Sequence, residues 1–250
     1  MPTEHDVVAH NTITISAEEG PDMTTTLITG ANKGLGYETA RQLIARGHTV
    51  YVGARSAERG QAAAATLGAR FVQLDVTDDA SVQAAMRVIE EREGRLDVLV
   101  NNAGIGGVAD VNGPIALRTF DTNVIGVIRV TQAALPLLEK SDNPVVVNVS
   151  SALGSFWAVT NPERRQFHYP AIIYGASKAA VSMLTVQYAK ARPDIKFNAV
   201  EPGFTATDLT AASSAGQPVE KGAEVIVRMA AIGKDGPTGT FWENGGALAW

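Results

Sequence analysis

Residues 25–36 read TTLITGANKGLG, an apolar and β-branched run that ends in a cluster of three glycines. The run predicts a buried β-strand, and the periodicity from Leu35 onward predicts a helix that follows it. Glycines at such a turn let backbone N–H groups approach a pyrophosphate, which then lies at the positive end of the helix. Because tight turns also use glycine for geometry alone, the motif by itself predicts only a strand–turn–helix unit.

The same alternation of short strand and longer helix continues to the end of the chain. The patterns predict strands at 25–29, 49–52, 70–74, 97–100, 144–149, 195–200 and 240–242, and helices at 35–46, 57–67, 78–93, 114–138, 174–191 and 219–232. Runs such as Val145-Val146-Val147 are apolar on both faces, as in a parallel strand covered by helices on both sides. The sequence therefore predicts a single α/β domain with a Rossmann-type, doubly wound parallel sheet of about seven strands.

The composition fits one globular domain and excludes several classes of protein. The chain has 250 residues, of which 45% are hydrophobic and 19% charged, and it contains no cysteine. Disulfides, thiolate catalysis and cysteine metal ligands are therefore excluded. Residues 1–22 hold five acidic residues and no Lys or Arg, while the remainder balances 21 acids against 21 bases. We divide the chain into an acidic leader, 1–22, and a folded domain, 23–250, without the basic surface of a nucleic-acid binder.

The sequence shows no pattern typical of a signal peptide, a membrane span or a metal site. No basic segment precedes an apolar stretch at the start of the chain. The uncharged segment 143–162 is interrupted by Asn, Gly and Pro. The four histidines are scattered without ligand spacing. We expect a cytoplasmic protein with no membrane, nucleic-acid or metal partner.

The end of the second predicted strand, Gly53-Ala54-Arg55, bears on the choice of nucleotide. An NAD-binding fold places an acidic side chain here to bind the adenosine ribose, and Ala54 offers none. Arg55 and Lys33 are cations near the expected place of a 2′-phosphate, which favours NADP(H). The alternative is that both are ordinary solvated surface charges.

Short polar residues follow the third and fourth predicted strands. Asp75-Val76 comes after the third, and Asn101-Asn102-Ala103-Gly104 after the fourth. Residues at the carboxyl ends of parallel strands line the ligand crevice of such a sheet. They could equally serve local turns, so neither pair decides the function alone.

Tyr174 and Lys178 are spaced i and i+4 in the fifth predicted helix, which places them on one face, one turn apart. A tyrosine is a poor acid–base group at neutral pH, and a nearby ammonium lowers its pKa toward the working range. Ser151 ends the fifth predicted strand and could bind a carbonyl oxygen through its hydroxyl. One such Tyr–Lys spacing is expected by chance in about one chain in five, so its weight comes from the motifs around it.

Taken together and in this order, the motifs resemble the classical short-chain dehydrogenase/reductase family. The matching motifs are TGANKGLG at 29–36, Asp75-Val76, NNAG at 101–104, Asn123, Ser151, YGASK at 174–178 and Pro202-Gly203. They extend over nearly everything after residue 22.

The resemblance implies which residues would form the site. The implied catalytic residues are Asn123, Ser151, Tyr174 and Lys178. The implied cofactor-binding residues are Gly30, Asn32, Lys33, Gly34, Leu35, Gly36, Arg55, Asp75, Val76, Asn102, Ala103, Gly104, Tyr174, Lys178, Pro202, Gly203, Thr205 and Thr207.

The resemblance also implies what the catalytic residues would do. Ser151 would orient the substrate carbonyl, and Tyr174 would exchange the proton. Lys178 would bind the nicotinamide ribose and lower the pKa of Tyr174, while Asn123 would hold a water that links Lys178 to solvent.

Ser151 and Tyr174 are 23 residues apart, about ten more than the family pattern implies. This insertion, within 156–173, resembles the carbonyl-reductase-like branch of the family. It is rich in aromatic residues, and we expect Phe156, Trp157, Phe167 and Tyr169 to contact substrate. The alternative is that these rings pack on the body or on a second subunit. A second segment, 211–217, could close over the cofactor.

The resemblance implies the NADPH-dependent reduction of an aldehyde or ketone, and the aromatic insertion favours a bulky, apolar one. Two alternatives stay open, an NAD-linked alcohol dehydrogenase working in the oxidative direction and a non-catalytic NADP-binding sensor. We expect a homo-oligomer, a dimer or tetramer. The insertion puts the usual packing of subunits in doubt, because the helix that begins at Tyr174 commonly forms the family's interface.

Overall fold

One eight-stranded sheet, in the order β3-β2-β1-β4-β5-β6-β7-β8, forms the centre of the computed structural model, which describes residues 23–106, 111–207 and 216–250. The strands are β1 (Thr25–Thr29), β2 (Thr49–Ala54), β3 (Arg70–Gln73), β4 (Val98–Asn101), β5 (Val145–Val149), β6 (Lys196–Glu201), β7 (Thr240–Glu243) and β8 (Gly246–Ala247). All neighbouring strands are parallel except β7 and β8. The predicted Rossmann-type sheet is confirmed, and β8, a two-residue strand, is the one that periodicity did not predict.

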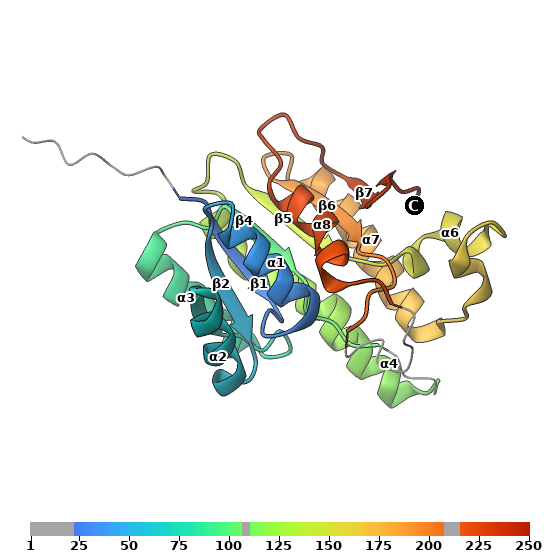
Figure 1. Ribbon diagram of the computed structural model, residues 1–250, viewed down its shortest axis with the longest axis horizontal. Coiled ribbons are helices and arrows are strands. Elements are labelled where there is room, and N and C mark those ends of the chain that lie inside the picture. Colours follow the sequence, from blue (N-terminus) through green and yellow to red (C-terminus); the bar gives the residue numbers. More distant parts are fainter. Residues whose placement is uncertain (1–22, 107–110, 208–215) are drawn as a thin grey trace, which may run out of the picture.

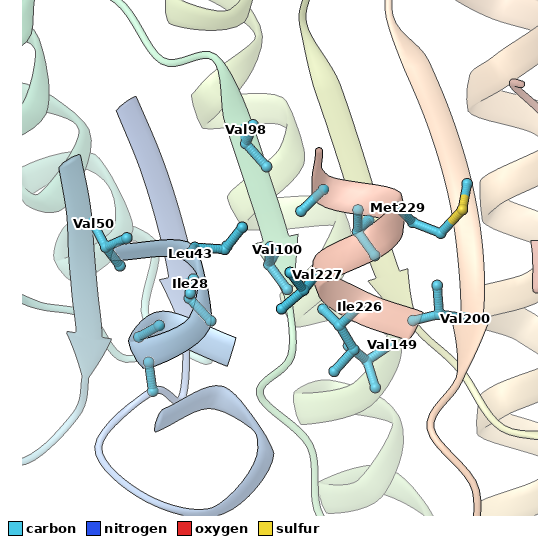
Figure 2. Close-up of a cluster of buried hydrophobic side chains, with 14 of the residues drawn as sticks. Ile28, Leu43, Val50, Val98, Val100, Val149, Val200, Ile226, Val227 and Met229 are labelled. Atoms are coloured by element: carbon cyan, nitrogen blue, oxygen red, sulfur yellow. The ribbon is translucent and has the colours of Figure 1, made fainter. Parts of the chain in front are cut away.

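Helices cover both faces of the sheet (Figure 1). The main helices are α1 (Gly34–Ile44), α2 (Ala57–Leu67), α3 (Asp79–Glu93), α4 (Gly113–Phe120), α5 (Gly126–Leu138), α7 (Ile172–Ala191) and α8 (Val219–Ala230). One buried cluster packs α1, α2 and α8 against one face of the sheet, and a second packs α3 and α5 against the other. Figure 2 shows the first cluster, in which Val227 of α8 lies beside Val100 of β4 and Ile226 beside Val149 of β5.

The single helix predicted at 114–138 is interrupted in the structure, and this prediction is wrong in that detail. A π-helical turn, η1 (Asp121–Ile125), separates α4 from α5. Gly126 follows it, and a Cβ there would lie 2.9 Å from a methyl group of Val76. Hydrophobic periodicity continues through this turn, so the sequence pattern could not locate it. Such bulges often occur at functional sites, and this one contains Asn123.

The insertion has regular structure and is fixed to the C-terminal end of the chain. It contains α6 (Phe156–Thr160) and two 3₁₀ turns, η2 (Ala152–Gly154) before it and η3 (Arg165–His168) after it. Ser155 Oγ donates to the carbonyl of Ala249 at 2.7 Å, and the Trp157 N–H donates to that of Trp250 at 3.0 Å.

A bidentate ion pair makes a second attachment of the insertion. The Arg164 guanidinium donates to both carboxylate oxygens of Glu243 on β7, at 3.1 and 2.7 Å. It also lies over the ring of Trp157, at 5.4 Å from the centroid. The insertion is therefore tied to the edge of the sheet.

Some predictions concern residues outside the described ranges. They are the leader 1–22 and most of the segment at 211–217, of which only Gly216 and Gln217 are described. Among the described helices, none is long and apolar enough to cross a membrane.

Glu243→Gln should loosen the insertion without unfolding the domain. A partly exposed ion pair stabilises by about 1 kcal/mol or less, so we expect little change in melting temperature. Hydrogen exchange over 156–168 should rise, because the amide leaves Arg164 without its charged partner. Glu224→Gln, which breaks the exposed Lys221–Glu224 pair on α8, is the control and should leave this segment unchanged. Equal exchange in both variants would contradict the assignment.

Candidate active site

The glycine turn after β1 is shaped for close backbone approach. Gly30 and Gly34 have φ of +64° and +57°, the left-handed region that favours glycine. A Cβ on Gly36 would lie 2.5 Å from Nδ2 of Asn102, which donates to the Thr29 carbonyl at 2.8 Å. Asn102 therefore holds the glycine turn in place from the end of β4.

The N-terminus of α1 lies at this turn and fits a phosphate. The residue before the helix, Lys33, does not cap it with its side chain, and the first turn contains no acidic residue. Backbone N–H groups and the helix dipole therefore favour an anion here. Thr207 lies on the same side, with its methyl 3.5 Å from where a Cβ on Gly34 would be.

Arg55 and Lys33 lie at one edge of the sheet. In the register of β1 and β2, Thr29 pairs with Gly53, so both cations follow paired strand ends by a few residues. Both are exposed, whereas Ala54 is buried. The two cations to which the sequence analysis assigned a 2′-phosphate thus follow the ends of neighbouring strands.

Asp75 and Val76 serve the local structure after β3. Asp75 Oδ1 accepts from the backbone N–H and the hydroxyl of Thr77, at 3.0 and 2.7 Å. Val76 is buried against Gly126. The turn role that the sequence left open is therefore present, and it orients Asp75 at the same edge of the sheet.

The ends of β5 and α7 bring Ser151, Tyr174 and Lys178 together. The Lys178 ammonium is buried and donates to the Val149 carbonyl at 2.7 Å, and it lies 5.7 Å from the centre of the Tyr174 ring. The Ser151 hydroxyl lies close enough to the Tyr174 phenol to oppose the rise in its pKa. The neighbouring Ser150 instead bonds the Lys178 carbonyl and Ser182, which leaves Ser151 as the serine at Tyr174.

Asn123 sits behind Lys178 and is held by Ile105 and Ser177. Its amide donates to the Ile105 carbonyl at 2.9 Å and to Ser177 Oγ at 3.0 Å, and its oxygen accepts the Ile105 N–H at 2.8 Å. A Cβ on Gly104 would lie 3.4 Å from Asn123 Oδ1 and 3.6 Å from Lys178 Nζ. Gly104 therefore keeps space open between these two side chains.

Burial dominates the protonation of this cluster. It raises the pKa of Tyr174 well above the usual value, aided by the charge of Glu201 and opposed by the bond from Ser151. It lowers the pKa of Lys178 to about 8, opposed by Glu201. The pKa of Tyr174 is raised overall, because desolvation of the phenol is the largest effect. That Lys178 lowers this pKa in the working enzyme stays a prediction.

The turn after β6 meets the glycine turn and contains Thr205, which the sequence analysis named, and Phe204, which it missed together with Glu201. Thr205 is buried and donates to the Gly203 carbonyl at 3.0 Å. Phe204 is 41% exposed, and the Arg165 guanidinium of the insertion lies 5.9 Å from its ring. Glu201, at the end of β6, is buried beside Ser151. Its position before Pro202-Gly203, at the carboxyl end of a predicted strand, was the available signal.

The four residues expected to contact substrate lie away from the catalytic cluster. Phe156, Phe167 and Tyr169 line an apolar groove of about 510 Å³ against the outer side of α7, together with Ile172 and other residues. Neither Ser151 nor Tyr174 lines that groove. Trp157 lies under Arg164 instead. These rings are therefore not brought onto the catalytic cluster, and packing remains the alternative for them.

No group of acidic or histidine side chains in the described ranges is arranged to hold a metal ion. The site therefore consists of a phosphate-compatible turn, two exposed cations and a buried Ser–Tyr–Lys cluster along one edge of the sheet.

Known proteins match this chain over most of its length. The family model for short chain dehydrogenase matches residues 24–218. A short-chain dehydrogenase/reductase of Stachybotrys chlorohalonatus is 37% identical, covering 88% of each chain. The (-)-isopiperitenone reductase of Mentha piperita is 32% identical, covering 89% of this chain and 97% of its own. The solved structure of NADPH-bound carbonyl reductase from chicken fatty liver aligns with a TM-score of 0.80 at 26% identity, covering 91% and 99%.

Gly154→Ala should disturb the cluster by forcing η2 away from α7. A Cβ there would overlap the backbone of Lys178 and Ala179, and overpacking of this kind costs about 1–3 kcal/mol. Chemical denaturation measures the loss in the free energy of unfolding. Gly113→Ala is the control, because no atom lies within 4 Å of a Cβ there, and it should stay within about 0.5 kcal/mol. Equal stability of the two variants would refute the close contact.

Proposed function

Because the chain belongs to the short-chain dehydrogenase family, we propose that it reduces an aldehyde or ketone to an alcohol with NADPH. The observation that carries the proposal is the cluster of Ser151, Tyr174 and Lys178, in which the serine and the lysine are buried, at the edge of the sheet where the glycine turn also lies. Relatives support the reaction class, since one is named as a reductase and the aligned structure as a carbonyl reductase.

The residues fit a dinucleotide in named places. The glycine turn and the N-terminus of α1 would hold the diphosphate, and Asn102 and Gly104 would shape the nucleotide pocket. Asp75 and Val76 would border the adenine, and Thr205 and Thr207 would contact the carboxamide. Lys178 would bind the nicotinamide ribose. Bound there, the nicotinamide would supply a hydride to the carbonyl carbon.

Tyr174 would donate the proton to the carbonyl oxygen. Its raised pKa keeps the phenol protonated at neutral pH, as an acid for reduction requires. A non-catalytic sensor is disfavoured because the cluster is intact. Ser151 would orient the carbonyl, and Asn123 would hold Lys178 in contact with solvent through a water.

The finer features remain proposals of the same kind. We propose a bulky, apolar carbonyl, because Phe204 is exposed in the turn after β6 and Arg165 of the insertion lies over its ring. The cysteine-free sequence supports a cytoplasmic location. A dimer or tetramer would have to accommodate the insertion that covers part of the outer side of α7.

Tyr174→Phe should bind NADPH normally and lose at least about 100-fold in kcat/KM, because only the proton donor is removed. The rate of NADPH oxidation in the presence of a ketone measures this loss. With a series of ketones from acetone to bicyclic ones, the unmodified protein should turn over the larger substrates faster. Tyr188→Phe is the matched control, since that ring stacks on Phe197 away from the cluster, and it should keep full activity. Near-full activity of Tyr174→Phe would refute the proposed acid.

Unmodified protein should prefer NADPH over NADH by at least about tenfold in kcat/KM, and Arg55→Ala should lose about tenfold of that preference, the equivalent of 1.4 kcal/mol. The reason is the loss of a charge-assisted hydrogen bond to the 2′-phosphate. Arg59→Ala removes a nearby exposed cation of α2 and should leave the ratio unchanged. Equal use of both nucleotides by the unmodified protein would overturn the assignment of Arg55 and Lys33.

A further inference from the structure

Glu201 is a buried carboxyl group that the proposed reaction does not use. It ends β6 and is 7% exposed. Its Oε2 accepts the Ala152 N–H at 2.5 Å, and its Oε1 accepts the Gly203 N–H at 3.1 Å. The Ser151 hydroxyl lies beside it, close enough to lower the pKa of the carboxyl group. The carboxyl group therefore connects the segment that carries Ser151 with the turn after β6.

The Ser151 hydroxyl cannot donate a hydrogen bond to all its neighbours at once. Its Oγ accepts the Leu153 N–H at 3.2 Å, and its hydroxyl is within hydrogen-bond reach of both Glu201 and Tyr174. A hydroxyl has one proton to donate. If that proton goes to Glu201, it is no longer available to Tyr174 or to a carbonyl oxygen in the cleft.

We propose that Glu201 is a positioning residue, whose protonation decides where the Ser151 hydroxyl points. A protonated Glu201 donates to Ser151 Oγ and directs the Ser151 proton into the cleft. An ionised Glu201 accepts that proton and withdraws the hydrogen bond from the substrate oxygen. The proton released on ionisation goes to solvent, and no covalent bond other than O–H changes.

Several groups act on this carboxyl from the elements packed around it. Burial raises the pKa of Glu201, and the negative charge of Glu243 on β7 adds to this, while the bonds from Ala152, Gly203 and Ser151 oppose it. The neutral form of Glu201 is therefore populated at pH values at which an ordinary carboxyl group is already ionised.

The remaining charged and titratable neighbours lie on α7 and on the insertion. The negative charge of Glu201 interacts with Tyr174 and Lys178 of α7 and acts to raise the pKa of each. The charge of Glu201 also interacts with Arg164 of the insertion, although the closest partner of Arg164 is Glu243. Because Glu201 is neutral at low pH and ionises as pH rises, the Ser151 proton is available at the lower pH and lost at the higher.

Kinetics across pH test this proposal, which rests on the proposed carbonyl reduction. Removing one donor to a developing oxyanion costs about 100-fold or more, so kcat/KM for ketone reduction should fall by about that factor as Glu201 ionises. Glu201→Gln, whose side chain does not ionise, should lack this fall. Ser151→Ala should lack it too, and adding Glu201→Gln to Ser151→Ala should change nothing further. Glu243→Gln is the control and should keep the fall.

A second measurement does not depend on activity. Infrared difference spectra over a pH titration should show the C=O stretch of a protonated carboxylic acid at pH values above those at which ordinary carboxyl groups ionise. The band should be absent in Glu201→Gln and shifted in Ser151→Ala, which loses the bonded hydroxyl. If Glu201→Gln does not fold, the shift in Ser151→Ala alone decides the question.

The outcomes separate the two proposals. If the unmodified protein reduces no carbonyl, the proposed function fails, while the infrared band and its shift still test the coupling of Glu201 to Ser151. If kcat/KM still falls with rising pH in Glu201→Gln, or if Ser151→Ala leaves the infrared band unshifted, the positioning role is overturned. Glu201 would then only tie the Ala152 and Gly203 backbones together.

Discussion

The hydrogen bond from the Lys178 ammonium to the Val149 carbonyl is the contact on which the rest of the site depends. It fixes α7 to the last residue of β5, so that Tyr174, one turn earlier, lies beside Ser151. The absence of a side chain at Gly154 lets the backbones of η2 and α7 meet at this point. A buried ammonium is costly unless it is paired, and this geometry provides the partner. The catalytic arrangement is thus a consequence of how one helix is attached to one strand.

Parallel strands then bring the remaining groups to the same place. The carboxyl ends of β1, β4, β5 and β6 lie at one edge of the sheet, as in other open α/β folds. The glycine turn, Asn102, Ser151 and Glu201 follow these four ends. Within the edge the chemistry divides into an exposed cationic part around Arg55 and a buried part around Tyr174. Such a division suits a ligand with a charged nucleotide at one end and a neutral carbonyl at the other.

Most of the fold and the identity of the catalytic cluster could be predicted from the sequence, because both depend on local patterns. Strand β1 and helix α2 were predicted with their exact bounds, since Gly30 and Gly68 mark their ends. The break at Asp121–Ile125 was not, because the apolar period runs through it. The ion pair between Arg164 and Glu243 joins residues 79 positions apart, and no local pattern signals it.

Protonation was the least predictable property. The spacing of Tyr174 and Lys178 shows that they share a helix face, but the depth of their burial depends on segments far along the chain. Burial raises the pKa of Tyr174. Glu201 was missed for the same reason, since an acid at the end of a predicted strand gives no sign of being enclosed. Distances and desolvation, rather than residue types, decide these effects.

The most direct measurement is isotopic. The protein is incubated with NADPH that carries deuterium at both hydrogen positions of nicotinamide C4 and with a bulky ketone, and the product is analysed by mass spectrometry. The account predicts an alcohol that carries deuterium on the carbinol carbon. An alcohol without deuterium, or no alcohol from any carbonyl tried with intact NADPH, would contradict it.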